Sequence, residues 1–374
     1  DKTLDSRRFP CLGTFFQQAG YDTGYVGKWH ISIPDANKAP VPGSPEQGFD
    51  FCANNLCNGA DIRNSDEAIR FLNMDRDKPF FLVVSYNNPH NICEWARGRH
   101  TELPDGDFGP PPSLDACPPL RPNHTPSEDE TDTITLMRRS YHASKTFPVG
   151  NFGEKEWREL AWAYYRMIEL VDRRMARVLD ALEQTAQKEN TLILFVSDHG
   201  DCHGAHRWNQ KTVFYDETAR VPFILSWPGR IQPGVSNSLV QTGTDLMPTL
   251  LEAAGIPIPT NLPGETLMTE AMTGVPGTSR DCIVVETKFL QGAEIDGCRP
   301  TPEGRMVRTE RFKYCVYDLG NHRESLCDMH EDPGETRNLA RDPAYAAMLD
   351  QHRKYLRDFC ERTGDWFRDA IPGR

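Results

Sequence analysis

The chain has 374 residues, of which 26% are charged and 38% hydrophobic, and its formal net charge is −12. This length can bury a large core in one or two domains, and the acidic balance argues against a nucleic-acid-binding surface, which needs clustered basic residues. No apolar run approaches the roughly 20 residues that span a bilayer. The first residues also lack the basic-then-apolar pattern of a signal peptide.

The cysteines leave the cellular compartment open. There are 11 of them, an odd number, so at least one is free or pairs outside the chain. Cys52 and Cys57 are close enough in sequence to pair locally, although spacing alone does not prove a bond. No CxxC pair indicates a structural zinc site.

The first part of the chain predicts alternating helices and strands. Residues 11–20 predict a short helix that ends at a glycine, and residues 21–29 predict a strand. Helical spacing at 61–74 is followed at 78–86 by a nearly continuous apolar run, which is typical of a strand covered on both faces. Residues 100–153 are rich in Pro, Gly and Asp, so we expect a surface excursion and not a core layer.

The second part continues the alternation. Residues 154–185 predict a long helix whose apolar stripe is assigned to the core, and 191–201 and 220–229 predict two more buried strands. The chain therefore predicts an α/β fold with a mostly parallel sheet sandwiched by helices.

From about residue 280 the pattern changes to shorter strands, at 281–287 and 312–319, and a terminal helix near 343–361. We therefore predict a catalytic domain at 1–279 and a smaller α+β subdomain at 280–374.

Polar side chains follow three of the predicted strands at their C-terminal ends. Lys28 and His30 follow the first strand, His90 follows the second, and Asp198 and His199 follow the third. Ligands of open parallel sheets bind beyond the carboxyl ends of the strands. We therefore expect these residues to share one pocket.

Each of these residues also has a simpler interpretation. A single lysine is commonly a solvated charge, a single histidine is commonly structural, and Asp198 resembles a helix cap. The turn "SDHGD" is more specific, because Asp198 and His199 supply a carboxylate and an imidazole that suit a divalent metal. With Lys28 and Lys211, which lies before the fourth strand, the set suits a bound tetrahedral anion.

Five segments of the chain, taken together, resemble a known family. In chain order they are "AGYDTGYVGKWH", "NNPH", "SDHGDCHGAHRWNQKTVFYDETARVPFIL", "TDLMPTLLEAAGIPIP" and "LCDMHEDPGETRNLA". They are similar, in the same order, to segments of the formylglycine-dependent sulfatases of the alkaline phosphatase superfamily. The resemblance covers nearly the whole chain and implies a sulfuric ester hydrolase.

The resemblance implies roles for the clustered residues. Asp198 and His199 correspond to the last pair of metal ligands, which implies Ca²⁺, with another divalent ion left open because many members have Asn at the second position. Lys28 and His30 match positions that hold the nucleophile and the sulfate.

Three further residues match the family pattern. His90 and Lys211 correspond to groups that contact the sulfate, and either could assist departure of the alcohol. His206 lies in a Gly-x-His element, where structural support and substrate contact are both open.

Two parts of the family pattern are missing. The nucleophile, a formylglycine made from Cys or Ser in a Cys-x-Pro-Ser-Arg motif, and an Asp-Asp metal pair precede the Gly-Lys-Trp-His segment in the family. "CPPLR" at 117–121 has Leu120 in place of the Ser and no helix to follow, and "DSRR" at 5–8 lies too close to the next helix. We therefore expect part of a longer chain, inactive by itself. A separate N-terminal piece and a nonfunctional sulfatase-like protein are the alternatives.

The expected activity is hydrolysis of a sulfate ester. "NPHNICEWARG" resembles the glycan-directed members, so we expect a sulfated carbohydrate or small molecule as substrate, with Asn91, Glu94 and Arg97 as candidate sugar contacts. The rivals are a phosphonate or phosphate ester hydrolase and a non-catalytic protein that binds sulfated glycans. The resemblance further implies a periplasmic or extracellular location.

Overall fold

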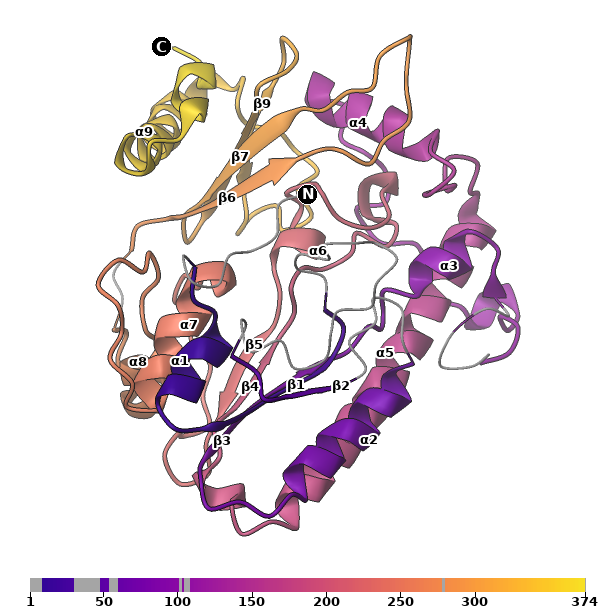
Figure 1. Ribbon diagram of the computed structural model, residues 1–374. Helices are drawn as coiled ribbons and strands as arrows, with labels where there is room; N and C mark the ends of the chain where they lie inside the picture. Colours follow the sequence, from indigo (N-terminus) through magenta and orange to yellow (C-terminus); the bar gives the residue numbers. More distant parts are fainter. Residues whose placement is uncertain are drawn as a thin grey trace.

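The computed structural model describes residues 9–29, 48–53, 60–100, 103, 108–277 and 280–373. In this part of the chain an α/β unit with a parallel sheet lies beside a unit built on an antiparallel sheet (Figure 1). The α/β class and the C-terminal antiparallel unit agree with the prediction, and the boundary at 279/280 stays a prediction. None of the described helices combines the length and apolar character needed to cross a bilayer.

Strand β1 (Asp22–Gly27) is the centre of the parallel sheet. It pairs with β2 (Phe51–Ala53) on one side and with β3 (Phe80–Ser85) on the other. In the second pair Gly27 lies opposite Ser85. The two strands therefore end together, so the residues that follow them start from the same edge of the sheet.

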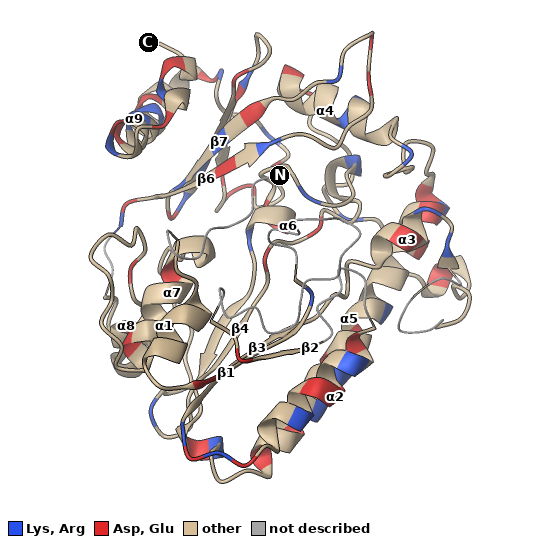
Figure 2. Ribbon diagram, in the orientation of Figure 1, with Lys and Arg blue, Asp and Glu red and all other residues tan. Residues whose placement is uncertain are grey.

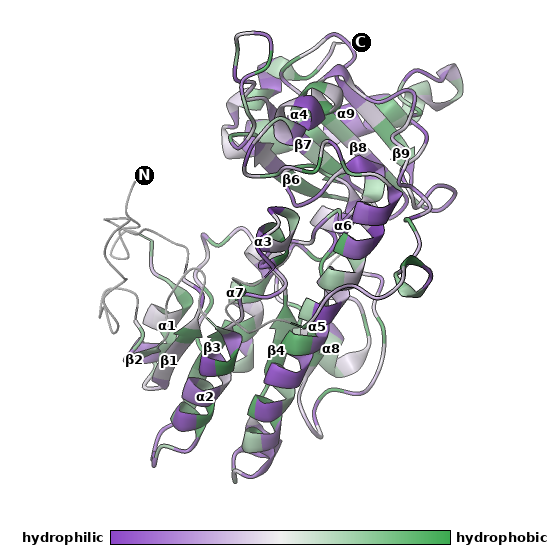
Figure 3. Ribbon diagram, turned by 90° about the vertical axis from the view of Figure 1, so that its right-hand side faces the viewer, coloured by the Kyte–Doolittle hydropathy of each residue, from purple (hydrophilic) through white to green (hydrophobic). Residues whose placement is uncertain are grey.

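Helices cover both faces of this sheet. Helix α2 (Asp61–Leu72) and the long helix α5 (Glu154–Glu183) lie side by side on one face, and α1 (Leu12–Gln18), α7 (Thr242–Ala253) and α8 (Met268–Thr273) lie on the other (Figure 1). Phe71 of α2 is 2% exposed and packs edge-on against the ring of Phe51. Lys and Arg are interspersed with Asp and Glu along α2 and α5 (Figure 2), and the sides of these helices seen in Figure 3 carry many hydrophilic residues.

The prediction that β4 (Ile193–Val196) and β5 (Phe223–Ser226) are buried strands is wrong. Their opposing residues Phe195 and Ile224 are 39% and 55% exposed. The two strands pair antiparallel, which a mostly parallel sheet allows. Within the described residues β4 and β5 pair only with each other, so apolar composition overstated how far they are covered.

The prediction of a surface excursion at 100–153 is also wrong. Helix α4 (Asp132–His142) lies in this segment, and its Met137 and Tyr141 are 0% exposed. The Tyr141 ring stacks on Phe147 with centroids 4.0 Å apart and on Trp208 at 5.2 Å. The sequence did not predict α4 because its few apolar positions at helical spacing lie between stretches rich in proline and glycine.

The C-terminal unit is a four-stranded antiparallel sheet covered by helix α9 (Ala346–Thr363). Its strands are β6 (Ile283–Lys288), β7 (Glu303–Arg308), β8 (Phe312–Tyr317) and β9 (Glu324–Asp328). The sequence predicted β6, β8 and α9, but it missed β7 and β9, whose charged residues interrupt the apolar pattern. The remaining helical elements are α3 (Ile92–Ala96), α6 (Asp216–Ala219) and the 3-10 turns Leu114–Ala116, Lys188–Asn190, Ala205–Arg207, Pro343–Tyr345 and Trp366–Ala370.

Candidate active site

The backbone at Lys28 is fixed where β1 ends. Its N–H donates to the carbonyl oxygen of Ser85 at 2.8 Å, and its own carbonyl accepts the Tyr25 hydroxyl at 2.6 Å. Gly27 has a φ of +100°, and a Cβ there would lie 2.0 Å from the Ser85 oxygen, so a residue without a side chain is required. The lysine therefore leaves the sheet from a defined point. His30 lies outside the described residues.

The loop that carries His90 is held by a buried carboxylate. Asp61, at the start of α2, is 1% exposed and accepts the backbone N–H groups of Asn87 at 2.7 Å and Asn88 at 2.8 Å. The N–H of His90 then donates to the Asn87 carbonyl at 2.9 Å. Asn64 joins this loop to β3, since its side-chain amide contacts both Asp61, at 3.1 Å, and the Ser85 carbonyl, at 3.3 Å. Asp61 was missed by the sequence reasoning.

Asp198 and His199 form a tight turn directly after β4. The His199 N–H donates to Asp198 Oδ1 at 2.9 Å, and His199 Nδ1 lies 2.7 Å from the Gly200 carbonyl oxygen. A carbonyl oxygen only accepts, so Nδ1 carries the proton and the unprotonated Nε2 accepts from the Lys211 ammonium, whose place a metal ion would take. His199 Nε2 is 2.7 Å from the Lys211 ammonium and 3.3 Å from Asp198 Oδ2.

These two side chains fit one side of a divalent cation site. A carboxylate oxygen and an unprotonated imidazole nitrogen converge, which is the donor chemistry a metal ion requires. The described residues contain no group of three or more His, Cys, Asp or Glu side chains placed to hold a metal. Asp198 and His199 would therefore supply part of a coordination shell.

Lys211 lies close enough to Lys28 and to the Asp198-His199 turn for their charges to affect its ammonium group. Burial lowers the pKa of Lys211, the Asp198 carboxylate opposes this shift, and the Lys28 ammonium adds to it. The charges of residues that follow β1 and β4 thus act on one amine. The neighbouring Gln210 amide contacts Cys93 Sγ, three residues beyond His90. The structure therefore gathers Lys28, Lys211 and the Asp198-His199 turn, and it brings the loop of His90 beside them.

The second aspartate of the "SDHGD" turn supports the same loop. Asp201 Oδ1 accepts the N–H groups of His203 at 2.7 Å and Gln210 at 3.0 Å. This carboxylate closes the 201–210 loop at the base of Lys211. The short motif contained this aspartate, but its partner at 210 was not visible from the motif.

His206 points into the interior. Its side chain is 0% exposed and stacks on Tyr215 with ring centroids 3.7 Å apart. Its Nε2 lies 3.3 Å from the Asn123 amide, and burial lowers the pKa of His206 to about 4. This burial favours structural support, one of the two roles left open by the sequence, over contact with substrate.

The candidate sugar contacts are engaged with their own domain. Asn91 is 3% exposed and accepts the Asn87 amide at 2.7 Å. Glu94 pairs with Arg97, whose Nε also donates to the Thr146 carbonyl at 3.0 Å. These contacts agree with a packed loop, and contact with sugar stays a prediction.

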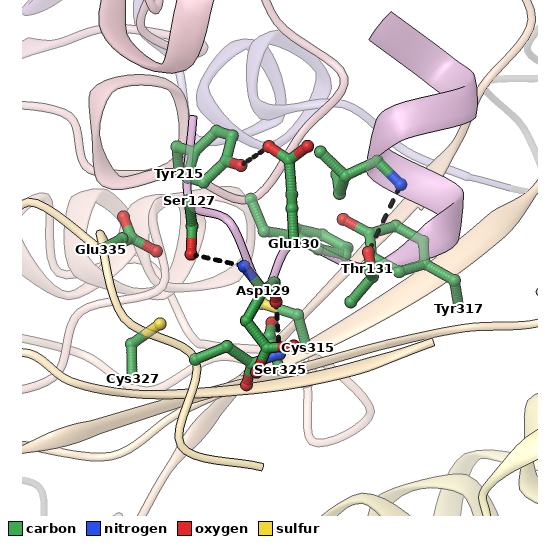
Figure 4. Close-up of a pocket in the computed structure, with 13 residues that line it drawn as sticks. Ser127, Asp129, Glu130, Thr131, Tyr215, Cys315, Tyr317, Ser325, Cys327 and Glu335 are labelled. Carbon is green, nitrogen blue, oxygen red and sulfur yellow. Dashed lines mark hydrogen bonds between the residues drawn. The ribbon is translucent and has the colours of Figure 1, made fainter. Parts of the chain in front are cut away.

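A cavity of about 40 Å³ lies elsewhere, between the 127–131 loop and strands β8 and β9 (Figure 4). In Figure 4 the Tyr215 hydroxyl donates to Glu130 at 3.0 Å across its wall. Glu335, another lining residue, accepts from the fully buried Lys313 ammonium at 2.9 Å. The cavity has room for a few water molecules and not for a sugar. We therefore interpret it as a small gap between packed elements and not as a substrate site.

Two family models match the chain. The Sulfatase family model matches residues 3–256, and the model described as "N-sulphoglucosamine sulphohydrolase, C-terminal" matches residues 204–362. The chain belongs to the sulfatase family. This confirms the predicted family of sulfuric ester hydrolases within the alkaline phosphatase superfamily.

Individual relatives of this sulfatase chain span most of its length. A Delta 4,5-hexuronate-2-O-sulfatase from Bacteroides thetaiotaomicron is 33% identical over 97% of the chain and 75% of that relative. The structure of a 2-O GAG sulfatase has a TM-score of 0.78 at 28% identity, covering 96% of this chain and 76% of the other. A phosphonate monoester hydrolase of Agrobacterium radiobacter has a TM-score of 0.65 at 22% identity over 94% of this chain and 80% of its own, which shows a shared fold alone.

Proposed function

We propose that this sulfatase chain hydrolyses a sulfate ester of a sulfated carbohydrate. The observation that carries the proposal is the cationic cluster at the strand ends, where Lys211 lies 2.7 Å from His199 and within electrostatic reach of Lys28. Among the described residues neither lysine forms an ion pair with a carboxylate. Two ammonium groups left without carboxylate partners favour a bound anion such as a sulfate.

The relatives support the class of substrate. The two sulfatases reported above are named for a hexuronate 2-O-sulfate and for a GAG 2-O-sulfate. We propose a sulfated glycan of this kind, reached outside the cytoplasm in the periplasm or the cell exterior. Activity recovered with a periplasmic or secreted fraction would support the location, and activity confined to the cytoplasm would contradict it.

The side chains have separate proposed roles. Lys28 and Lys211 hold the sulfate oxygens and balance the negative charge that develops on them. His90 or Lys211 gives a proton to the departing alcohol oxygen, which removes the need to expel an alkoxide. Asp198 and His199 would hold a divalent cation, Ca²⁺ in our proposal, which when bound supplies further positive charge. The formylglycine nucleophile would come from outside the described residues.

The main enzyme rival is a phosphonate or phosphate ester hydrolase. Two observations are compatible with this rival: the Asp198-His199 pair and the fold that the chain shares with the phosphonate monoester hydrolase. Turnover of an aryl sulfate and of the matching aryl phosphonate ester by the full-length protein separates the two. We expect faster sulfate hydrolysis, and faster phosphonate hydrolysis would reject the proposal.

A non-catalytic glycan-binding protein is the rival from another class. It would bind a sulfated glycan in calorimetry without releasing sulfate. A Cys or Ser in a Cys-x-Pro-Ser-Arg context in the full-length sequence, together with sulfate release, would exclude this alternative.

A further inference from the structure

Near the candidate active site, three polar side chains have polar atoms that form no hydrogen bond with the described residues. Arg121 forms no side-chain hydrogen bond or ion pair with the described residues, and its Nε is buried without a partner. His203 is 7% exposed, and its Nδ1 is likewise buried without a partner. Tyr164 is half-buried, and within the described part of the chain its hydroxyl has no hydrogen-bond partner.

Three elements bring these side chains together. The segment after Arg121 packs on the segment after His203, because the His124 ring contacts the Gly204 carbonyl at 2.6 Å and Asn123 accepts the N–H of His206 at 2.7 Å. Tyr164 reaches the same place from α5, with its ring centroid 4.5 Å from that of His203.

This group adjoins the sulfate cluster. The His203 backbone is fixed by Asp201, whose carboxylate also holds Gln210, the neighbour of Lys211. The charges of Asp198, Asp201 and Arg121 all act on the Tyr164 hydroxyl. Burial lowers the pKa of His203, and the Arg121 charge adds to this shift. The group therefore lies beside the loop that carries Lys211.

We propose that Arg121, His203 and Tyr164 form a second anion subsite, which binds a further acidic group on the sulfated sugar. The guanidinium and the phenol are hydrogen-bond donors, and the guanidinium matches a carboxylate or a sulfate with two parallel hydrogen bonds. A buried donor without a partner favours a ligand that satisfies it. The inference rests on the proposed function, because the acidic group belongs to the substrate of the same site.

The test compares three sugars that carry the sulfate ester at the same position. One is a uronate, the second is the same sugar with its carboxylate reduced to an alcohol, and the third has a second sulfate on that alcohol. The full-length protein and its Arg121→Gln variant are assayed for kcat/KM on each sugar, and affinities are measured by calorimetry. We expect wild type to prefer the uronate or the disulfate, and Arg121→Gln to reduce that preference by about 10- to 100-fold.

Two variants act as controls. Arg173→Gln removes an exposed arginine from the same helix as Tyr164 and should keep the preference. Arg121→Lys retains the charge without the paired geometry and should keep part of it, which guards against misfolding of the glutamine variant.

The outcomes separate the two proposals. Sulfate release with an unchanged preference in Arg121→Gln, or an equal loss in Arg173→Gln, would overturn the subsite and leave the sulfatase proposal in place. Binding that loses its preference in Arg121→Gln, without sulfate release from any sugar, would support the subsite and reject hydrolysis. A uronate preference identifies a carboxylate as the group bound, and a disulfate preference identifies a second sulfate.

Discussion

Two lysines of this protein lie in polar clusters of opposite kinds. Lys313 is 1% exposed, and its ammonium meets Glu335 and Asp216 together with the Phe214 carbonyl. Lys211 is half-buried, and its closest polar partner is an imidazole. The carboxylates around Lys313 raise its pKa, whereas burial lowers the pKa of Lys211.

This contrast separates a structural cluster from a candidate active site. The protein surrounds Lys313 with enough negative charge to hold it, so that cluster needs no ligand. The ammonium groups of Lys211 and Lys28, in contrast, form no ion pair with a carboxylate of the described residues. Loss of Lys313 should therefore affect stability, and loss of Lys211 should affect turnover.

The largest expected effect follows from Lys313→Met. The variant leaves two carboxylates in a buried site without their cation, so the free energy of unfolding should fall by about 3–5 kcal/mol in urea denaturation. Lys354→Met, at an exposed lysine of α9 that pairs with Asp358, should leave it nearly unchanged. Similar small losses in both variants would remove the contrast.

Lys211→Ala should affect activity in place of stability. Loss of a charge that balances the sulfuryl group should lower turnover by about 10²-fold or more, with little change in unfolding, and His90→Ala should behave in the same way. Lys155→Ala, at an exposed lysine of α5, provides the comparison. Wild-type rates in the first two variants would show that the strand ends do not share a catalytic pocket.

The buried cluster should also give a pH dependence. One ammonium cannot balance two carboxylates, and burial raises the pKa of Glu335 to about 7 from 4.5. The folded state then binds a proton that the unfolded state has released, so stability should fall by about 2 kcal/mol as pH rises from about 5 to about 7. Glu335→Gln should lack this component when unfolding is measured across the same range. An identical slope in both proteins would contradict the assignment.

The smallest effect concerns the loop that carries His90. In Asp61→Asn one of the two oxygens that accept the Asn87 and Asn88 N–H groups becomes an amide donor, so turnover should fall by about 5- to 10-fold with KM little changed. Asp66→Asn, in the same helix, removes an exposed carboxylate that pairs with Arg177 and should leave turnover unchanged. Equal rates for wild type and Asp61→Asn would mean that the loop keeps its position without this support.

Local sequence patterns predicted the parts of the fold that depend on local spacing. Strands β1 and β3 and helix α5 have apolar patterns that packing preserves, although Ile168 on the predicted stripe of α5 is 39% exposed. Helix α4 was missed because the prolines and glycines around it outweighed its few apolar positions. The sequence likewise placed β4 and β5 in a fully covered sheet, since apolar composition does not reveal which neighbours pair.

The candidate site divides in a similar way. The rule that ligands bind beyond strand ends was enough to select Lys28 and His199. Lys211, which precedes β5, was added as a second ammonium group suited to a bound anion. Asp61 could not be found in this way, because its partner Asn87 is 26 residues away in sequence and the contact exists only after folding. Arg121 was noticed only as part of a rejected nucleophile motif.

The contact of Lys313 with the 214–216 segment links the C-terminal sheet to the loop that follows Lys211, and this affects local unfolding. Residues of the C-terminal sheet hold the backbone a few positions after Lys211, and the Glu335 carboxylate also accepts the Asp216 N–H at 2.7 Å. We therefore expect the C-terminal sheet and this segment to unfold together. Hydrogen exchange should find that the amides of this segment and of β8 become accessible in a single cooperative step.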